Sequence, residues 1–184
     1  VLKECEKQGM PAEVALIPIV ESGYRPTAHS RVGASGLWQM MPGTASAYGV
    51  PINWWFDGRR DLHQSTQAAL KYIKYLHRRF NGQWLLAIAA YDAGEGRIEK
   101  AIKRNKKENK PTDFWSLKLP NETQNYIPKL LAIREIIKKP KKYHHQLPEI
   151  YNNIPFSEVT IPNQIDLYDI GQKCDTPIDE ILEY

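Results

Sequence analysis

Apolar side chains recur at helical spacing in several segments of the first 145 residues, so the chain is predicted to be mainly α-helical. The clearest helix runs from residue 62 to about residue 80, with Asp61 as its cap and Asn81-Gly82 as its stop. Residues 84–91 are apolar nearly all round, which is typical of a short helix buried in the middle of a fold. We therefore expect this segment to lie at the centre.

Two more helices are predicted further along the chain. Gly94 and Gly96 turn the chain into an amphipathic helix that runs through about Arg104, and another helix runs from near Glu122 to before Pro140. An apolar stripe marks the second of these helices and consists of Ile127, Leu130, Leu131, Ile133, Ile136 and Ile137.

The segment before residue 22 is ambiguous on its pattern alone. Pro11 suits a first helical position, and a helix from about Ala12, kinked at Pro18, would carry Glu21 at its far end. The β-branched residues make a strand locally plausible as well. Residues 23–36 are rich in Gly, Ser, Pro and Thr without apolar periodicity, so we expect a loop beside Glu21.

The character of the chain changes toward the C-terminus. Thr176 is a plausible helix cap there. Three dipeptides are typical of extended segments, namely Leu147-Pro148, Ile154-Pro155 and Ile161-Pro162. We expect one domain over residues 1–145 and an irregular, partly helical C-terminal appendage over residues 146–184.

Glu21 is the most informative candidate for chemistry, because it follows the apolar run of residues 14–20. A carboxyl group in such a segment is expected to be partly desolvated, which disfavours its anion and raises its pKa. A raised pKa would let Glu21 donate a proton near neutral pH as a general acid. The alternative is an exposed glutamate at the end of a buried helix.

Four sequence blocks resemble the lytic transglycosylases of bacterial cell-wall metabolism, in the order found in that family. The blocks are Glu21-Ser22-Gly23-Tyr24, residues 33–45, residues 89–97 and residues 122–127. Residues 53–61 and 112–117 narrow the resemblance to the membrane-bound type D branch of the family. The resemblance covers roughly residues 8–145 and implies a lysozyme-like helical fold, shared with goose-type lysozymes.

The resemblance implies an enzyme that cleaves the β-1,4 bond between N-acetylmuramic acid and N-acetylglucosamine in peptidoglycan. Glu21 would protonate this bond and then act as base on the muramyl 6-hydroxyl, which gives a 1,6-anhydromuramyl product. Two alternatives stay open. One is a goose-type lysozyme-like hydrolase using the same glutamate, and the other is a non-catalytic peptidoglycan-binding protein. Retention of Glu21, Tyr91 and Gln39 argues against the second.

The same resemblance implies a set of substrate-binding residues. Ser22 and Gln39 are expected to hydrogen-bond substrate, although Ser22 could simply end a helix and Gln39 could brace a loop. Met41 and Tyr91 are expected to line the pocket of the acid, with the Tyr91 hydroxyl offered to the carboxylate; otherwise both belong to the core.

The last block of the resemblance adds two residues. Tyr126 is expected to face the substrate. Glu122 is expected to brace the nearby chain or the substrate, with a helix-cap role as its alternative.

Asp92 is assigned to the same site but departs from the family, which usually has asparagine at this place. An ionised Asp92 near Glu21 would raise the pKa of that acid, or would hold a water molecule and favour hydrolysis. A position among backbone amides would make the change nearly silent. Trp38, Trp54 and Trp55 could stack on sugar faces, while a buried structural role fits the Trp54-Trp55 pair at least as well.

Composition narrows the possible partners. A formal charge of +4 suits an anionic polymer such as peptidoglycan, but it would equally suit many neutral partners. The basic clusters at residues 100–110 and 138–142 lack interleaved aromatic residues and any nucleic-acid-binding signature, so we expect solvated surface rather than a nucleic-acid site.

No metal and no cofactor are expected, because the histidines have no ligand spacing and Cys5 and Cys174 form no metal motif. A single disulfide between these cysteines is possible. No apolar run is long enough to span a bilayer, so no membrane insertion is expected. We expect a monomer in a bacterial periplasm or cell envelope, with any membrane anchor in a segment absent here.

Overall fold

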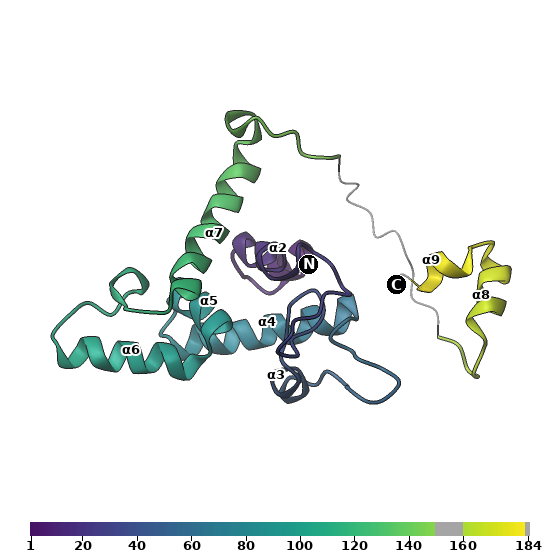
Figure 1. Ribbon diagram of the computed structural model, residues 1–184, viewed down its shortest axis with the longest axis horizontal. Helices are drawn as coiled ribbons and strands as arrows, with labels where there is room; N and C mark the ends of the chain where they lie inside the picture. Colours follow the sequence, from purple (N-terminus) through teal and green to yellow (C-terminus); the bar gives the residue numbers. More distant parts are fainter. Residues whose placement is uncertain (150–159, 183–184) are drawn as a thin grey trace. The chain divides into compact units, whose positions relative to one another are not determined.

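The structure, a computed structural model, describes residues 1–149 and 160–182. The chain divides into two compact units, Val1–Leu147 and Pro148–Tyr184, and each is described by itself. The described residues form α-helices, short 3-10 helices and isolated β-bridges, with no β-strand among them (Figure 1). The prediction of a mainly helical protein is therefore confirmed.

Helix α5 (Trp84–Ala93) lies at the centre of the first unit, as its pattern predicts. It packs against α4 (Leu62–Arg79), α6 (Glu95–Lys107) and α7 (Asn121–Lys138), which surround it in Figure 1. Leu86 and the four residues after it are buried, because neighbouring helices cover several sides of α5. The Asp61 side chain caps α4 by accepting a hydrogen bond from the backbone N–H of Gln64 at 2.6 Å.

The segment that carries Glu21 is helical, but it is not one kinked helix. A 3-10 helix, η1 (Ala12–Leu16), leads into α2 (Ile17–Ser22), and Pro18 lies in the first turn of α2. A proline in a first turn removes an N–H that has no partner inside the helix, so it starts α2 instead of bending it. Gly23 then ends α2 with a left-handed φ of 63°.

Two other sequence expectations differ from the structure in detail. Gly94 turns the chain with φ of 84°, but Gly96 lies inside α6 rather than in the turn. The apolar stripe of α7 is buried only in part: Ile127 and Leu130 are in the core, whereas Leu131 and Ile137 are exposed.

Four short elements of the first unit have no counterpart among the predictions, because six or fewer residues give too little periodicity. They are α1 (Leu2–Lys7), α3 (Pro42–Ala47), η2 (Phe114–Ser116) and η3 (Pro140–Tyr143). The buried Cys5 side chain of α1 belongs to the core, and both cysteines of the chain are free thiols.

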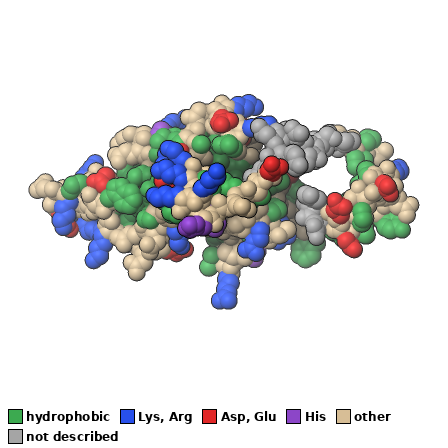
Figure 2. Space-filling view, turned by 90° about the horizontal axis from the view of Figure 1, so that it is seen from above, with side chains coloured by type: hydrophobic (Ala, Val, Ile, Leu, Met, Phe, Trp, Pro, Cys, Tyr) green, Lys and Arg blue, Asp and Glu red, His purple; other side chains and the backbone are tan. Residues whose placement is uncertain are grey.

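The basic clusters lie in solvent, as expected. All Lys and Arg side chains of residues 100–110 and 138–142 are exposed. Figure 2 shows Lys and Arg side chains spread over the visible face. Within residues 1–149 and 160–182, no helix is long and apolar enough to cross a membrane.

The second unit contains two helices, α8 (Leu167–Cys174) and α9 (Ile178–Leu182). Asp166 caps α8 by accepting a hydrogen bond from the Tyr168 N–H at 2.7 Å. Helix α9 begins at Ile178, and the Thr176 hydroxyl donates to the Cys174 carbonyl at 3.1 Å, so a cap from the Thr176 side chain stays a prediction. The predicted extended dipeptide Ile154-Pro155 lies outside the described residues.

Candidate active site

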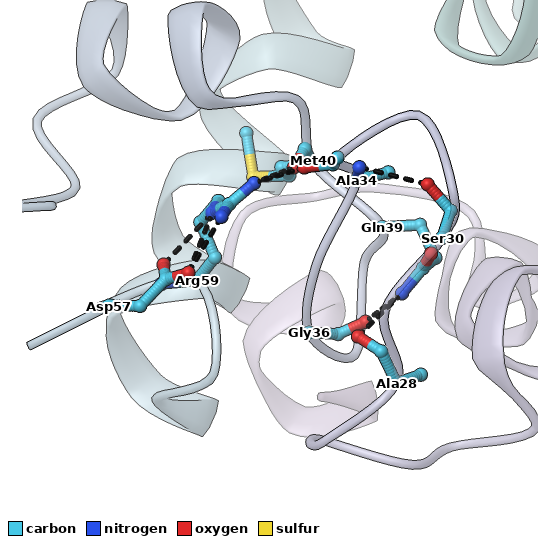
Figure 3. A network of polar contacts seen from close by, with 9 residues as sticks. Ala28, Ser30, Ala34, Gly36, Gln39, Met40, Asp57 and Arg59 are labelled. Atoms are coloured by element: carbon cyan, nitrogen blue, oxygen red, sulfur yellow. Dashed lines mark hydrogen bonds and ion pairs between the residues drawn. The ribbon is translucent and has the colours of Figure 1, made fainter.

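The loop that follows α2 is held in shape by one buried arginine. The Arg59 guanidinium donates from Nη1 to the Gly33 carbonyl at 2.7 Å and to the Met40 carbonyl at 3.0 Å. It also pairs with the Asp57 carboxylate at 2.6 Å (Figure 3). The hydrogen bonds from Arg59 lower the pKa of Asp57, so this carboxylate stays ionised and the guanidinium charge stays paired. Arg59 thus ties two points of the 33–40 loop to one chain segment.

Gln39 braces the same loop from within. Its Nε2 donates to the carbonyl oxygens of Ala28 at 3.1 Å and Gly36 at 2.8 Å (Figure 3). Its backbone has φ of 45°, a left-handed conformation that non-glycine residues seldom adopt. The loop-bracing alternative for Gln39 is therefore what the structure contains, and its contact with substrate stays a prediction.

Glu21 lies in the last turn of α2, and its carboxylate meets the side chain of Tyr126 on α7. The Tyr126 hydroxyl donates to Glu21 Oε1 at 2.5 Å, although the two residues are 105 positions apart. Burial raises the pKa of Glu21 to about 7, and the hydrogen bond from Tyr126 opposes this rise because it stabilises the anion. Burial wins, so this carboxyl group is substantially protonated near neutral pH.

Two further carboxylates influence the acid. The negative charges of Asp92 and Glu122 raise the pKa of Glu21 further, after the larger contribution of burial. Asp92 is itself partly buried, which raises its pKa, while a hydrogen bond from the Thr123 side chain opposes that rise. Asp92 therefore bonds to a side chain on α7 and acts on Glu21 through its charge.

Tyr91 lies near the acid but does not bond to it as predicted. Its hydroxyl donates to the Trp38 carbonyl at 2.7 Å, and its ring meets the Trp38 ring edge-on with centroids 6.5 Å apart. Burial raises the pKa of Tyr91 well above its usual value, and the nearby charge of Glu21 adds to the effect. The hydroxyl expected from Tyr91 comes instead from Tyr126.

The other predicted site residues, Ser22, Met41 and Glu122, differ in burial and in their contacts. Ser22 is buried, and its hydroxyl donates to the Leu37 carbonyl at 2.8 Å, which links α2 to the loop. Met41 precedes α3 and is 45% exposed. Glu122 is exposed in the first turn of α7 and makes no cap hydrogen bond there. No direct contact of Met41 or Glu122 with the acid is described, so their binding roles stay predictions.

The tryptophans reverse the expected assignment. Trp38 is fully buried and donates from Nε1 to the Thr66 hydroxyl at 3.0 Å, so its ring is not available to stack on a sugar. Trp54 and Trp55 are 90% and 91% exposed, so the buried structural role considered for this pair is wrong.

Sequence reasoning assigned no role to Arg59, Asp57 or Thr123. A weak signal existed for the first two, because an acid and an arginine two residues apart in a Gly-containing turn commonly form a local ion pair. No local signal exists for Thr123, whose partner Asp92 lies on another helix. Among the residues that the structure describes, no group of three or more His, Cys, Asp or Glu side chains could hold a metal ion.

The fold and site together define a class of protein: a helical domain with one carboxyl group whose pKa is about 7 and which accepts a hydrogen bond from the buried Tyr126, as suits a general acid. The Transglycosylase SLT domain family matches residues 2–114. The chain belongs to this family, which makes it a member of an enzyme family.

Two relatives are similar to this chain over most of its length. The chain is 40% identical over 181 residues to the membrane-bound lytic murein transglycosylase D of Escherichia coli (strain K12), covering 98% of this chain and 40% of that protein. It is 42% identical over 153 residues to a putative tributyltin chloride resistance protein of Alteromonas sp. (strain M-1), covering 83% and 72% of the two chains. The chain thus spans less than half of the first relative and most of the second.

Solved structures show the same fold. An inactive mutant of the lytic transglycosylase Slt from Pseudomonas aeruginosa superposes with a TM-score of 0.57 at 27% identity, covering 78% of this chain and 24% of that one. The 70 kDa soluble lytic transglycosylase of Escherichia coli gives a TM-score of 0.53 at 28% identity, covering 67% and 21%. The expected lysozyme-like fold is therefore confirmed.

Proposed function

We propose that residues 1–145 form the catalytic domain of a peptidoglycan lytic transglycosylase, with residues 146–184 as an appendage. The domain would cleave the β-1,4 bond between N-acetylmuramic acid and N-acetylglucosamine and leave a 1,6-anhydromuramyl end. Membership of the Transglycosylase SLT domain family supports the reaction class. Relatives are named as membrane-bound and as soluble murein transglycosylases, which supports peptidoglycan as the substrate and a bacterial envelope as the location.

One observation carries the proposal: a single carboxyl group, Glu21, has a pKa of about 7 and accepts a hydrogen bond from the buried Tyr126 hydroxyl. An ordinary glutamate is almost fully ionised at pH 7 and is a poor proton donor there. At pH 7, Glu21 is protonated in a large fraction of the molecules and ionised in the rest. Such a group serves as acid in one step and as base in the next.

The two steps follow from this balance. In the first step, protonated Glu21 gives its proton to the glycosidic oxygen as the bond to the anomeric carbon breaks and positive charge develops on the sugar. In the second step, the Glu21 carboxylate removes the proton of the muramyl 6-hydroxyl, whose oxygen attacks the anomeric carbon of the same sugar. Attack within one sugar has a high effective molarity, so no water-activating carboxylate is needed.

Tyr126 has a defined part in this cycle. Its hydroxyl donates to Glu21 Oε1, which leaves Oε2 for the proton that is transferred. After the first step the same hydrogen bond stabilises the new carboxylate. Tyr126 therefore keeps the pKa of Glu21 from rising further and holds the carboxyl group in one orientation.

The remaining residues are proposed to shape the binding surface. Ser22 and Gln39 hold the loop beside the acid through their hydrogen bonds to backbone carbonyls. We expect both residues to contact the substrate where it passes this loop. Met41 offers an exposed apolar side chain. Glu122 adds negative charge near the acid, as Asp92 does. We propose that the domain acts as a monomer and uses Glu21 without a metal or a cofactor.

Hydrolysis is the second candidate, and Asp92 is the observation that favours it. Its negative charge acts on Glu21, so an ionised Asp92 stands where it could orient a water molecule for attack on the sugar. The balance between the two reactions then depends on whether the 6-hydroxyl or water reaches the anomeric carbon first.

Digestion of purified peptidoglycan followed by mass spectrometry of the muropeptides tests the proposal. Anhydro products differ from hydrated products by one water, so a spectrum dominated by anhydro ends supports the transglycosylase, and hydrated ends identify a hydrolase. Glu21→Gln should abolish either reaction, with Glu6→Gln, an exposed glutamate on α1, as the matched control. Undiminished digestion by Glu21→Gln would remove the assignment of the acid, and no digestion by the wild-type chain would favour a binding protein.

A further inference from the structure

The most unusual surface feature of the first unit is the Trp hairpin, residues 51–58, which places two tryptophans in solvent. Trp54 is 90% exposed and Trp55 is 91% exposed, whereas tryptophan is a largely buried residue in most proteins. Phe56, next to them, is 42% exposed. Adjacent exposed aromatic side chains on a folded domain mark an interaction site.

The Trp hairpin is an ordered structure. Ile52 and Asp57 form an antiparallel bridge, and the Asn53 N–H donates to the Phe56 carbonyl at 2.8 Å. The Asn53 side-chain oxygen also accepts from the N–H groups of Trp55 and Phe56, both at 2.9 Å. These bonds satisfy the turn from within, so the backbone that carries the two tryptophans is ordered before any partner binds.

The same hairpin is anchored to the loop beside the acid. Asp57 binds Arg59, and Arg59 binds the Met40 carbonyl (Figure 3). Arg59 also binds the Gly33 carbonyl. Gly36 approaches the Arg59 backbone so closely that an added Cβ would lie 1.8 Å from its carbonyl oxygen. The Trp hairpin and the loop therefore form one rigid piece of surface.

That loop reaches the acid through two more hydrogen bonds. Its Leu37 carbonyl accepts from Ser22, the neighbour of Glu21, and its Trp38 carbonyl accepts from Tyr91. A continuous set of hydrogen bonds thus fixes the Trp hairpin relative to Glu21. A polymer that is cut at Glu21 extends away from that point and can be held elsewhere on the same rigid surface.

We propose that Trp54 and Trp55 form a carbohydrate-stacking subsite that holds the glycan strand at sugars away from the bond that is cleaved. The subsite rests on the proposed function for the identity of the strand. A pyranose ring presents a face of C–H bonds that packs on the electron-rich face of an indole, while its hydroxyl and acetamide groups remain in water. Two neighbouring indoles on an ordered turn offer such faces, and each side chain has only two torsion angles to fix on binding.

The charge of the Trp hairpin favours a glycan over a membrane surface. Aromatic segments that bind anionic bilayers usually carry Lys or Arg beside the aromatic residues. Residues 51–58 contain neither, and their one ionisable side chain is Asp57, an acid already paired with Arg59. The Asp57–Arg59 pair is neutral overall, and the uncharged aromatic tip above it suits the uncharged faces of amino sugars.

Binding to insoluble peptidoglycan tests the subsite without catalysis. The Glu21→Gln chain is mixed with purified peptidoglycan, and the bound fraction is measured by sedimentation for Trp54→Ala, Trp55→Ala and the double variant in that background. The double variant should bind about 30-fold more weakly, as expected for loss of two aromatic anchors. Trp115→Ala is the matched control, because Trp115 is also exposed, at 61%, and should leave binding unchanged.

A kinetic measurement separates this inference from the proposed function. In the active chain, the double variant should raise KM on long glycan strands and leave kcat on a single tetrasaccharide near the wild-type value. If the wild-type chain cleaves but the double variant binds and cleaves like the wild type, the subsite is overturned and the proposed function stands. If the wild-type chain does not cleave, the sedimentation assay still decides the subsite.

Vesicles provide the competing outcome. Wild type and double variant are mixed with vesicles of phosphatidylethanolamine and phosphatidylglycerol, and the tryptophan emission is recorded. Two results together would overturn the glycan subsite in favour of a membrane contact. The wild type would show a blue shift with vesicles that the double variant lacks, and the double variant would bind peptidoglycan as well as the wild type does. A Trp54- and Trp55-dependent blue shift with peptidoglycan fragments and none with vesicles supports it.

Discussion

Replacing Glu21 by glutamine should make the protein more stable at alkaline pH and leave its stability almost unchanged at acidic pH. The reason is that burial raises the pKa of Glu21 from 4.5 to about 7, so the folded protein prefers the uncharged form. Glutamine has nearly the same shape as a protonated glutamic acid, never ionises, and can still accept the hydrogen bond from Tyr126. The variant therefore mimics the protonated state at every pH.

The sign and size follow from linkage. A folded-state pKa above the unfolded value means that the folded protein binds more protons between about pH 4.5 and 7, so the wild type loses stability as the pH rises through this window. A shift of about 2.5 units, from 4.5 to about 7, corresponds to about 3 kcal/mol at 1.36 kcal/mol per unit. This value is an upper bound, because part of the Glu21 side chain reaches solvent.

Urea unfolding of both proteins at pH 5 and pH 8, followed by circular dichroism, measures the effect. The advantage of Glu21→Gln should be small at pH 5 and should grow by about 2–3 kcal/mol at pH 8. Glu6→Gln, at an exposed position of α1, should show no such growth. A difference between wild type and Glu21→Gln that stays constant from pH 5 to pH 8 would refute the claim that the fold disfavours the ionised acid.

Three further changes test the surroundings of the acid. Tyr126→Phe removes a hydrogen bond to the anion, so the alkaline limb of the pH–rate profile should move up by about one unit, whereas Tyr91→Phe should leave it in place; equal shifts would contradict this assignment. Asp92→Asn removes a negative charge, so the same limb should move down by a fraction of a unit, and anhydro products should increase if Asp92 recruits water; an unmoved limb and product ratio would make its charge irrelevant. Gly36→Ala should destabilise the domain by about 2 kcal/mol or more in urea, because its φ is +82° and the added Cβ would overlap a neighbouring carbonyl oxygen; a wild-type midpoint would show that the hairpin can shift away.

The helices could be predicted where the sequence repeats over several turns. Residues 62–79 carry a cap and an apolar stripe, and residues 84–91 are apolar nearly all round, so both their type and the burial of the second follow from local pattern. Residues 2–7 and 42–47 form helices of six residues, which give less than two turns of pattern. Their stability comes from contacts that the sequence does not show, such as the burial of Cys5 in the core.

The acid itself was visible in the sequence, but its partner was not. The apolar run before Glu21 predicts desolvation, and the pKa of about 7 agrees with it. Which tyrosine bonds to the carboxylate depends on how α5 and α7 pack around α2, since Tyr91 and Tyr126 both carry a hydroxyl. The burial of Trp38 could not be predicted for a similar reason. Its indole N–H is satisfied by the Thr66 hydroxyl on α4, and the local sequence does not indicate that partner.

The small residues of α5 connect the packing of the core to the chemistry of the acid. Ala87, Ala89 and Ala90 are fully buried in a helix that packs against α7, and α7 carries Tyr126 to Glu21. Small side chains let α5 approach its neighbouring helices closely, so a larger side chain at these positions would disturb the packing of α5 among α4, α6 and α7. Since a hydrogen bond weakens within a few tenths of an ångström, such a shift would release Tyr126 from the carboxylate before it unfolded the domain. The pKa of the acid is therefore a property of helix packing as much as of the residues that touch it.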